Sequence, residues 1–168
     1  MKKIKIHIRN NHWKEGFLPC DAEGEKNNTI TKEEIEKGFD QYPELRDKVE
    51  YLIDWDDDNF VYSMQSADIL LGWQFPTQDL KQIAPNLKWI HVISAGVNHL
   101  SPFGWMNKDL VLTNSSGVHA KKAGEFGLMS ILMLQNHMTR IVTNQKNKEF
   151  VSLLGKPIEG RKVVVVGT

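Results

Sequence analysis

Short apolar segments alternate with segments of helical character along this chain, and this alternation is the feature that most restricts its fold. The predicted strands lie at residues 4–8, 51–53, 67–71, 87–93 and 110–113. The predicted helices lie at residues 31–39, 77–84 and 119–142, and a long loop is predicted over residues 10–30. Strands that alternate with helices favour an open parallel α/β sheet, in which ligands bind beyond the carboxyl ends of the strands.

The first two predicted helices have start signals in the sequence. Thr31 and Glu34 fit a capping box, in which the Thr31 hydroxyl accepts a hydrogen bond from the third helical amide and Glu34 accepts one from the Thr31 amide. Thr77 is predicted to cap the second helix, which Pro85 ends. These signals place a helix before and after the strands in the middle of the chain, as the alternating fold requires.

The third predicted helix, residues 119–142, is apolar nearly all round rather than along one stripe. Such a helix must be covered on several sides. Gly124 and Gly127 lie inside it, where each glycine costs about 1 kcal/mol relative to alanine. We therefore predict that another backbone approaches this helix closely at the glycines.

The overall composition excludes several classes of partner. Lysine and arginine together number 21, as do aspartate and glutamate, so the neutral chain has no electrostatic reason to bind nucleic acid or a membrane surface. Cys20 is the single cysteine, which excludes an internal disulfide and favours a reducing compartment. The first residues alternate in polarity, unlike a signal peptide, and no segment reads as a membrane span. We expect a cytoplasmic protein.

The sequence ends with a polar lead-in, the four valines Val163–Val166, and Gly167. This pattern is typical of the start of a dinucleotide-binding βαβ unit, in which the valines form a buried parallel strand. Gly167 would be the first glycine of the Gly-x-Gly-x-x-Gly pattern, and the remaining glycines and the acidic residue for the ribose do not follow it. We expect Gly167 to be a cofactor-binding residue of an incomplete site.

Small and polar residues follow the predicted strand at 87–93, beginning with Ser94-Ala95-Gly96-Val97. Successive backbone amides at a helix start hold a carboxylate without a cationic side chain. Gly96 allows close backbone approach, and the small Ala95 leaves room for a ligand. A plain strand-to-helix turn has the same composition, so the pattern alone leaves both interpretations open. Ala95, Gly96 and Val97 are our candidate substrate-binding residues.

Three motifs in order make residues 65–168 resemble the D-isomer-specific 2-hydroxyacid dehydrogenases. They are the loop at 94–100, the segment 112–120 with Gly124-Glu125 and Arg140 after it, and the valine-glycine end. The resemblance implies a flavodoxin-like substrate-binding domain at residues 1–114, with a parallel sheet and helices on both faces. It implies that residues 115–168 are the connecting helix and first strand of a truncated NAD-binding Rossmann domain.

The same resemblance implies an activity for the parent enzyme. That activity is the NAD-dependent reduction of a small 2-oxo acid, or the oxidation of a D-2-hydroxy acid, with the amides at Gly96 and Val97 holding the substrate carboxylate. The catalytic histidine, its carboxylate and the substrate arginine of the family match no position here, so we expect no catalytic residue in this chain, and an inactive fragment. We expect no metal site either, because the spacing of His7, His12, His91 and His137 does not suggest one. His99 is expected to stabilise its loop.

An uncovered helix and an unpaired strand recruit other chains. The sequence therefore predicts a homo-oligomer, such as a dimer, formed through residues 119–168.

The acidic cluster Asp54, Asp56, Asp57 and Asp58 supports a different function. It follows residues 51–53 as the phospho-acceptor aspartate follows a strand in receiver domains, and clustered carboxylates hold Mg²⁺. Receivers also need an acidic pair after the first strand, where this chain has asparagines, and a solvated acidic turn is the simpler interpretation. The alternative function is a non-enzymatic flavodoxin-like binding module or receiver-type switch.

Overall fold

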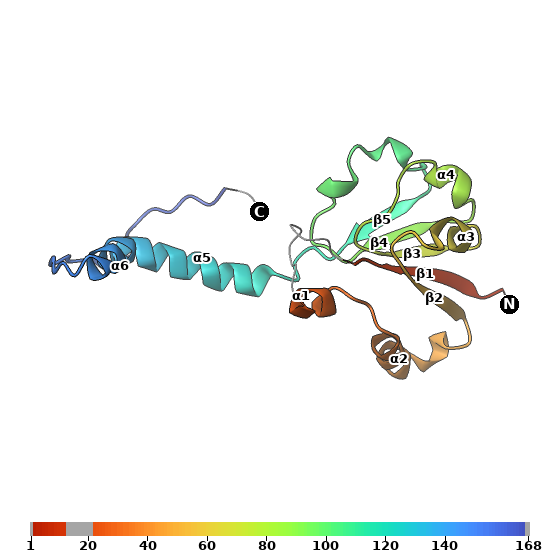
Figure 1. The fold of residues 1–168 in the computed structure, drawn as a ribbon, viewed down its shortest axis with the longest axis horizontal. Coiled ribbons are helices and arrows are strands. Elements are labelled where there is room, and N and C mark those ends of the chain that lie inside the picture. The colour runs from red at the N-terminus through yellow and green to blue at the C-terminus, as the bar shows by residue number, and fades with distance from the viewer. Residues whose placement is uncertain (1, 13–21, 167–168) are drawn as a thin grey trace. The chain divides into compact units, whose positions relative to one another are not determined.

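A computed structural model describes residues 2–12 and 22–166 of the chain. The chain divides into two compact units, Met1–Gly117 and Val118–Thr168 (Figure 1). The first unit contains a sheet with helices, and the described part of the second contains two helices and an extended segment. The substrate and cofactor roles expected for the two parts of the chain stay predictions.

The sheet of the first unit has five strands, all parallel, in the order β2-β1-β3-β4-β5. The strands are β1 (Ile4–Asn10), β2 (Val49–Trp55), β3 (Ile69–Gly72), β4 (Trp89–Val92) and β5 (Val111–Asn114). The predicted open parallel α/β sheet is therefore confirmed, and its order is the one found in flavodoxin-like folds.

Helices lie on both faces of this sheet (Figure 1). One face carries α1 (Ala22–Asn27) and α2 (Lys32–Gln41), and the other carries α3 (Phe60–Met64) and α4 (Leu80–Ile83). Single turns of 3₁₀ helix occur at η1 (Pro43–Leu45), η2 (Asn98–Leu100) and η3 (Phe103–Trp105). The capping box of α2 is confirmed, because the Thr31 hydroxyl accepts from the Glu34 amide at 3.3 Å and Glu34 accepts from the Thr31 amide at 2.9 Å.

Two local predictions for the first unit are wrong. Helix α1 lies inside the segment predicted as a loop over residues 10–30. Thr77 does not cap α4, since the helix begins after Asp79, which has a left-handed φ of 54° and no side-chain capping bond. Helix α3 has no counterpart among the predicted helices, because five residues are too few to give a helical period.

The core lies on the face that α3 and α4 cover. Its most buried side chains are Leu70, Ile90 and Val92 from the strands and Phe60, Met64 and Leu80 from the helices, all 2% exposed or less. The register places His7 beside Leu70 on this face, and His7 is also only 2% exposed. Ile8, which faces the other side of the sheet, is also 2% exposed, so β1 is covered on both sides at its carboxyl end, as is typical of a central strand of a parallel sheet.

Gly72 lies on this core face at a position where any larger side chain would clash with the neighbouring strand. It pairs with Arg9, and a β-carbon at this position would lie 2.8 Å from the Arg9 carbonyl oxygen. We expect Gly72→Ala to lower the free energy of unfolding by about 1–3 kcal/mol, because two paired strands must move apart. Thermal and denaturant unfolding measure the effect.

Gly38→Ala is the matched control for that substitution. Gly38 lies inside α2, and no atom lies within 4 Å of its β-carbon position. Alanine there should raise stability by up to about 1 kcal/mol, because it is the better helix former. If both variants changed stability in the same direction, the steric role of Gly72 would be wrong.

The second unit departs from the prediction of one long helix over 119–142. Helix α5 (Ala120–Gln135) ends, and α6 (Met138–Lys146) begins after His137, whose φ of 56° is left-handed. The backbone amide and the side chain of Asn136 both donate to the Leu132 carbonyl oxygen, at 3.1 and 2.9 Å, and the His137 amide donates to the Leu134 carbonyl oxygen at 3.2 Å, where the helical pattern ends. None of the described helices is long and apolar enough to cross a membrane.

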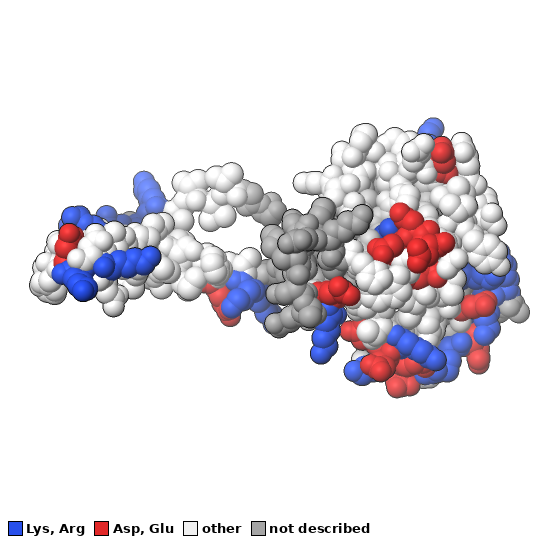
Figure 2. Space-filling view, in the orientation of Figure 1, with Lys and Arg blue, Asp and Glu red and all other residues white. Residues whose placement is uncertain are grey.

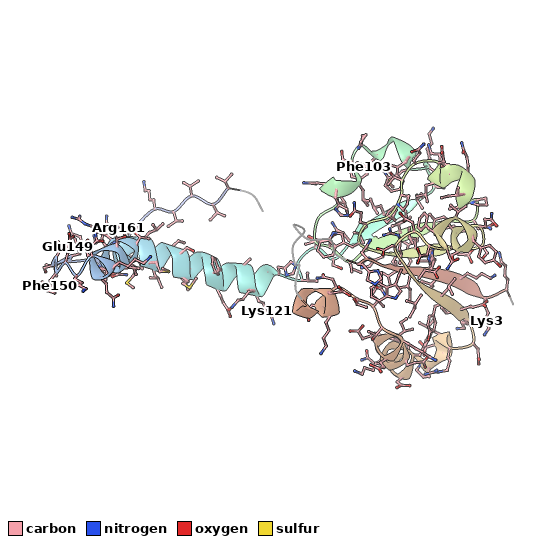
Figure 3. The ribbon with its side chains drawn as sticks, in the orientation of Figure 1. Lys3, Phe103, Lys121, Glu149, Phe150 and Arg161 are labelled. Atoms are coloured by element: carbon pink, nitrogen blue, oxygen red, sulfur yellow. The ribbon has the colours of Figure 1, made fainter. Side chains whose placement is uncertain are left out.

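The predicted strand Val163–Val166 is not formed. These valines are 50% to 95% exposed and have no regular structure. A strand needs a neighbour for its backbone hydrogen bonds, and the described part of the second unit offers none. Other apolar side chains of this unit are exposed as well: Phe150 projects into solvent with 96% of its surface exposed (Figure 3).

Candidate ligand-binding site

The carboxyl end of the sheet has a natural ligand position between β1 and β3. The chain passes from β1 outward to β2 on one side, and the remaining strands follow on the other side of β1. The two connections leave the sheet in opposite directions at this point, and ligands of open α/β sheets bind in the resulting crevice. The segments that follow β1, β3 and β4 lie at this edge of the sheet.

A row of paired residues crosses the sheet near its carboxyl edge. Arg9 pairs with Gly72, Gly72 with Val92, and Val92 with Asn114. Arg9 also pairs with Asp54 of β2, so the row runs across all five strands from Asp54 to Asn114, and its residues face the same side of the sheet. Arg9 and Asn114 each donate a hydrogen bond to one of the loops described below.

The turn Ser94–Val97 follows β4 and is held by its neighbours. The Ser94 hydroxyl donates to the Gly96 carbonyl oxygen at 2.6 Å, and the Asn114 side chain donates to the Ala95 carbonyl oxygen at 3.0 Å. The Ser115 amide donates to the Ser94 carbonyl oxygen at 3.0 Å, which joins the turn to the end of β5. All three carbonyl oxygens of the first part of the turn are thus engaged within the protein.

The backbone amides of this turn, unlike its carbonyl oxygens, are left without partners in the described part of the chain. Within the described residues, the amides of Gly96 and Val97 donate to no protein acceptor. Gly96 is exposed, and no atom lies within 4 Å of its β-carbon position, so the space beside it is open. The helix expected after the turn is only the 3₁₀ turn η2, so free amides rather than a helix dipole would attract an anion here.

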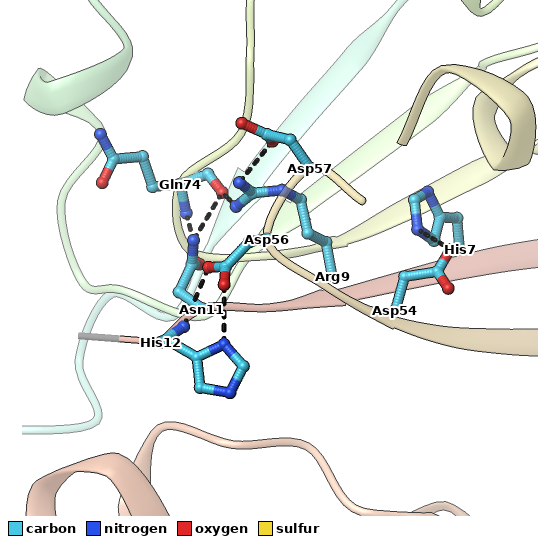
Figure 4. Close-up of polar contacts among 8 residues, drawn as sticks. All are labelled: His7, Arg9, Asn11, His12, Asp54, Asp56, Asp57 and Gln74. Carbon is cyan, nitrogen blue, oxygen red and sulfur yellow. Dashed lines mark hydrogen bonds and ion pairs between the residues drawn. The ribbon is translucent and has the colours of Figure 1, made fainter. Parts of the chain in front are cut away.

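The segment Trp73–Gln74 follows β3 and lies between the loops after β1 and β4. Arg9 donates through its Nη1 to the Gln74 carbonyl oxygen, and Asn11 and Gln74 exchange two weaker bonds of 3.4 Å (Figure 4). From the other side, His99 Nε2 lies 2.8 Å from the Trp73 carbonyl oxygen, to which it can donate. The expected loop-stabilising role of His99 has this contact in its favour.

Arg9 is the least expected member of the site. Its side chain is 6% exposed, and its Nη2 donates to Asp57 Oδ1 at 2.7 Å, while the Asp57 side chain is 64% exposed. Its guanidinium also lies over the Phe60 ring, 5.8 Å from the centroid. Burying a cation whose partner is exposed to solvent lowers the stability of the fold. A buried arginine at the end of β1 is therefore unusual for a purely structural residue.

Acidic side chains gather on the visible face of the first unit (Figure 2). At the end of β2, Asp56 Oδ2 lies 2.7 Å from Nδ1 of His12, and Asp56 also accepts from the His12 amide at 3.0 Å. The hydrogen bond to Asp56 raises the pKa of His12. His12 stacks on Trp55, with 4.4 Å between ring centroids. This pair ties the loop after β1 to the loop after β2.

Asp54 is occupied in a different way from a phospho-acceptor. It accepts from the Ser63 hydroxyl at 2.6 Å, and its side chain is 11% exposed. It also lies 3.1 Å from His7 Nε2 (Figure 4). Burial lowers the pKa of His7, and the nearby Asp54 opposes this only in part. Among the described residues, no group of three or more potential metal ligands is present. These contacts do not favour the receiver-type alternative.

The structure brings the three predicted substrate-binding residues together in one turn at the carboxyl edge. Gly167 lies outside the described residues. Arg9, Asn11 and Gln74 were missed by sequence reasoning, although all of them follow or end predicted strands. The signal that points to them is the position where the strand order reverses, which requires the topology.

Comparisons with known proteins give the fold. No protein-family model matches the chain, and no curated protein matches it. Solved structures do match: a D-isomer specific 2-hydroxyacid dehydrogenase family protein from Aeromonas salmonicida aligns over 96% of this chain, with a TM-score of 0.61 and 16% identity. A protein of the same description from Klebsiella pneumoniae aligns over 94%, with a TM-score of 0.56 and 20% identity.

A third match is a probable 2-hydroxyacid dehydrogenase from Rhizobium etli in complex with NADP, HEPES and L(+)-tartaric acid. It aligns over 93% of this chain, with a TM-score of 0.57 and 17% identity. The aligned parts are 42% to 44% of these structures, so this chain spans less than half of their length. At such low identities the likeness establishes the shared fold.

Proposed function

We propose that this chain is the substrate-binding part of a D-2-hydroxyacid dehydrogenase that reduces a 2-oxo acid or oxidises a D-2-hydroxy acid. The observation that carries the proposal is the turn Ala95–Val97, with its engaged carbonyl oxygens and free amides beside open space. Its fold is shared with proteins of that description, and its three sequence motifs occur in the family's order.

In this proposal, the amides of Gly96 and Val97 hold the carboxylate of the substrate. Fixed amides suit an anion because they offer partial positive charge without a mobile side chain. Asn114 and Ser94 keep the turn in shape through their bonds to Ala95 and Gly96. The complex of a matched protein with tartaric acid, a small hydroxy acid, supports a ligand of this class.

The cofactor of the proposed whole enzyme is a nicotinamide dinucleotide. The sequence resemblance implies NAD. A matched protein is in complex with NADP, which supports a nicotinamide dinucleotide as the class of cofactor. Such a cofactor supplies or accepts the hydride at the carbonyl carbon. The valines Val163–Val166 are not part of a sheet, and Gly167 lies outside the described residues.

The proposal includes assembly with a second copy through residues 119–168. No described residue of this unit is buried, and large apolar side chains such as Phe126, Leu128 and Leu134 are more than half exposed. A mainly apolar groove is lined by residues of both helices and of the break between them: Glu125, Leu128, Met129, Leu132, Met133, Asn136 and Met138. Exposed apolar area of this kind marks a surface that another protein covers.

Binding of pyruvate tests the proposed site directly, without requiring turnover. In ¹⁵N-labelled protein, pyruvate is expected to shift the amide signals of Gly96 and Val97, because its carboxylate accepts from them. Methyl pyruvate, which lacks the charge, should shift them far less. Gly96→Leu should weaken pyruvate binding roughly tenfold or more by filling the open space, which corresponds to about 1.4 kcal/mol.

Gly104→Leu is the matched control, because no atom lies within 4 Å of its β-carbon position either and it lies in η3, away from the turn. Both variants should unfold at nearly the wild-type temperature, since neither new side chain meets the protein at its β-carbon. Pyruvate that leaves the Gly96 and Val97 signals unmoved, or equal loss of binding in both variants, would contradict the proposed function.

A further inference from the structure

A cavity of about 420 Å³ lies on the face of the sheet that α3 covers, and it takes no part in the candidate ligand-binding site. It is bordered by β1, β2 and the segment that leads from α3 to β3, and none of the residues of the turn Ser94–Val97 lines it. Helix α3 has only five residues and β2 is an edge strand, so part of β2 stays uncovered beside the helix. A cavity of this volume suits a small organic molecule.

The deep wall of this cavity is polar and buried. His7 and Ser63 both line it, at 2% and 6% exposure. The Ser63 hydroxyl donates to Asp54 at 2.6 Å, so its oxygen is left to accept a hydrogen bond from a ligand. His7 Nε2 lies 3.1 Å from the same carboxylate (Figure 4) and has no hydrogen-bond partner among the described residues. A wall with an acceptor next to a buried carboxylate favours a cationic donor group.

Two opposite charges stand side by side in the lining of the cavity. Lys5 of β1 and Glu50 of β2 are paired in the register of the sheet. Among the described residues, neither the Lys5 ammonium nor the Glu50 carboxylate forms an ion pair or a side-chain hydrogen bond. Neighbouring strands are about 4.8 Å apart, so the two side chains start close together. A ligand with a carboxylate and an ammonium on one carbon can therefore meet both charges at once.

The opening of the cavity is apolar. Leu52, which is 48% exposed, and Tyr62, which is 77% exposed, belong to its lining, and the buried Ala67 continues the apolar surface inward. An aliphatic side chain placed between Leu52 and Tyr62 removes apolar surface from water. A ligand with only a negative charge is repelled by Glu50, and one with only a positive charge is repelled by Lys5.

We propose that this cavity binds a free α-amino acid with an aliphatic side chain. The ligand carboxylate contacts Lys5, its ammonium group contacts Glu50 and the Ser63 oxygen, and its side chain packs against Leu52 and Tyr62. This binding site goes beyond the proposed function, since it shares no residue with the turn that holds the 2-oxo acid. The two sites are therefore tested separately.

L-Leucine and its two singly charged analogues test the site. In ¹⁵N-labelled protein, L-leucine is expected to shift the amide signals of Lys5, Glu50 and Ser66 and to leave those of Gly96 and Val97 in place. 3-Methylbutylamine lacks the carboxylate, and 4-methylpentanoate lacks the ammonium group. Each analogue should bind at least about tenfold more weakly than L-leucine, the value of one charge-assisted hydrogen bond.

The substitutions Lys5→Gln and Glu50→Gln should each weaken L-leucine binding about tenfold, because each removes one charged partner. Lys48→Gln and Glu44→Gln are the matched controls, since both residues are exposed and outside the lining of the cavity. All four variants should unfold at nearly the wild-type temperature. Cavity signals that L-leucine leaves unmoved, analogues that bind as tightly as L-leucine, or an equal loss of binding in the controls would overturn the inference. None of these outcomes affects the test with pyruvate.

Discussion

Phe60→Ala is expected to lower the free energy of unfolding of the first unit by about 3–5 kcal/mol. Phe60 is 1% exposed in the core between α3 and the sheet, so its removal leaves a cavity. Total stabilities of domains lie at about 5–15 kcal/mol, and the variant should therefore be close to unfolding at room temperature. Denaturant titration followed by circular dichroism measures the loss.

The same substitution has a second expected effect, on His7. The rings of His7 and Phe60 lie 5.7 Å apart, and burial holds the pKa of His7 below its ordinary value of 6.5. At a pH just below 6.5, His7 of the wild type is therefore more protonated in the unfolded chain than in the folded one. The free energy of unfolding thus decreases as the pH falls through this range. In Phe60→Ala, water reaches His7, so its pKa should rise and this acid-side loss should become smaller.

Phe103→Ala is the control for both effects. Phe103 is 40% exposed, so its truncation should cost less than about 1 kcal/mol and leave the titration of His7 unchanged. NMR titration of the histidine ring protons reports the pKa. A Phe60→Ala protein that loses stability while the pKa of His7 remains as low as in the wild type would show that Phe60 does not shield His7.

The double substitution of Leu128 and Leu132 by glutamate is expected to convert an oligomer into a monomer. Both side chains line the apolar groove of α5, at 56% and 40% exposure, and burying two carboxylates in an apolar contact costs several kcal/mol. Light scattering coupled to size exclusion measures the mass. The first unit should retain its unfolding temperature, because the helix lies outside it.

Salt provides an independent test of the same assembly. Residues 118–168 contain eight lysines and arginines against three glutamates, so two copies that meet there bring like charges together. Salt should therefore strengthen association by screening this repulsion. Lys121→Glu, on the exposed start of α5, is the control and should leave the apolar contact in place. A wild-type chain that stays monomeric at high concentration at every salt level would show that no second copy covers this surface.

Several strands were predictable from the sequence, β1 from the alternation of isoleucines with polar residues and β3 and β4 from short apolar runs. Leu70, Ile90 and Val92 belong to such runs, which are typical of strands buried on both faces of a parallel sheet. Thr31 and Glu34 were also predictable, since a capping box acts within one helical turn. Local patterns thus defined the sheet and the helix that begins at Thr31.

The candidate site was predictable only in part. Ala95, Gly96 and Val97 form a local turn, and their sequence pattern marks it. Arg9 and Gln74 are more than sixty residues apart, and their contact depends on β1 and β3 being neighbours, which no local pattern states.

Residues 119–168 were predicted less well for a physical reason. The valines at 163–166 have strong strand propensity, but a strand forms only beside a partner, and propensity cannot supply one. The break at His137 lies where the backbone takes a left-handed φ of 56°, which the apolar pattern of residues 119–142 does not indicate.

The central position of β1 has a consequence for the order in which the first unit forms. The first strand in the chain pairs with β2, as Ile4 with Val49, and with β3, as Ile6 with Ile69, so none of its ladders is local. Each pairing requires a long loop to close, and the entropy of that loop is lost before the stabilising contacts between the strands form. During synthesis, β1 must therefore remain unpaired until β2 and β3 have emerged, and the two polar residues that will hold the crevice, Arg9 and Asn11, acquire their shared partner only at the arrival of Gln74.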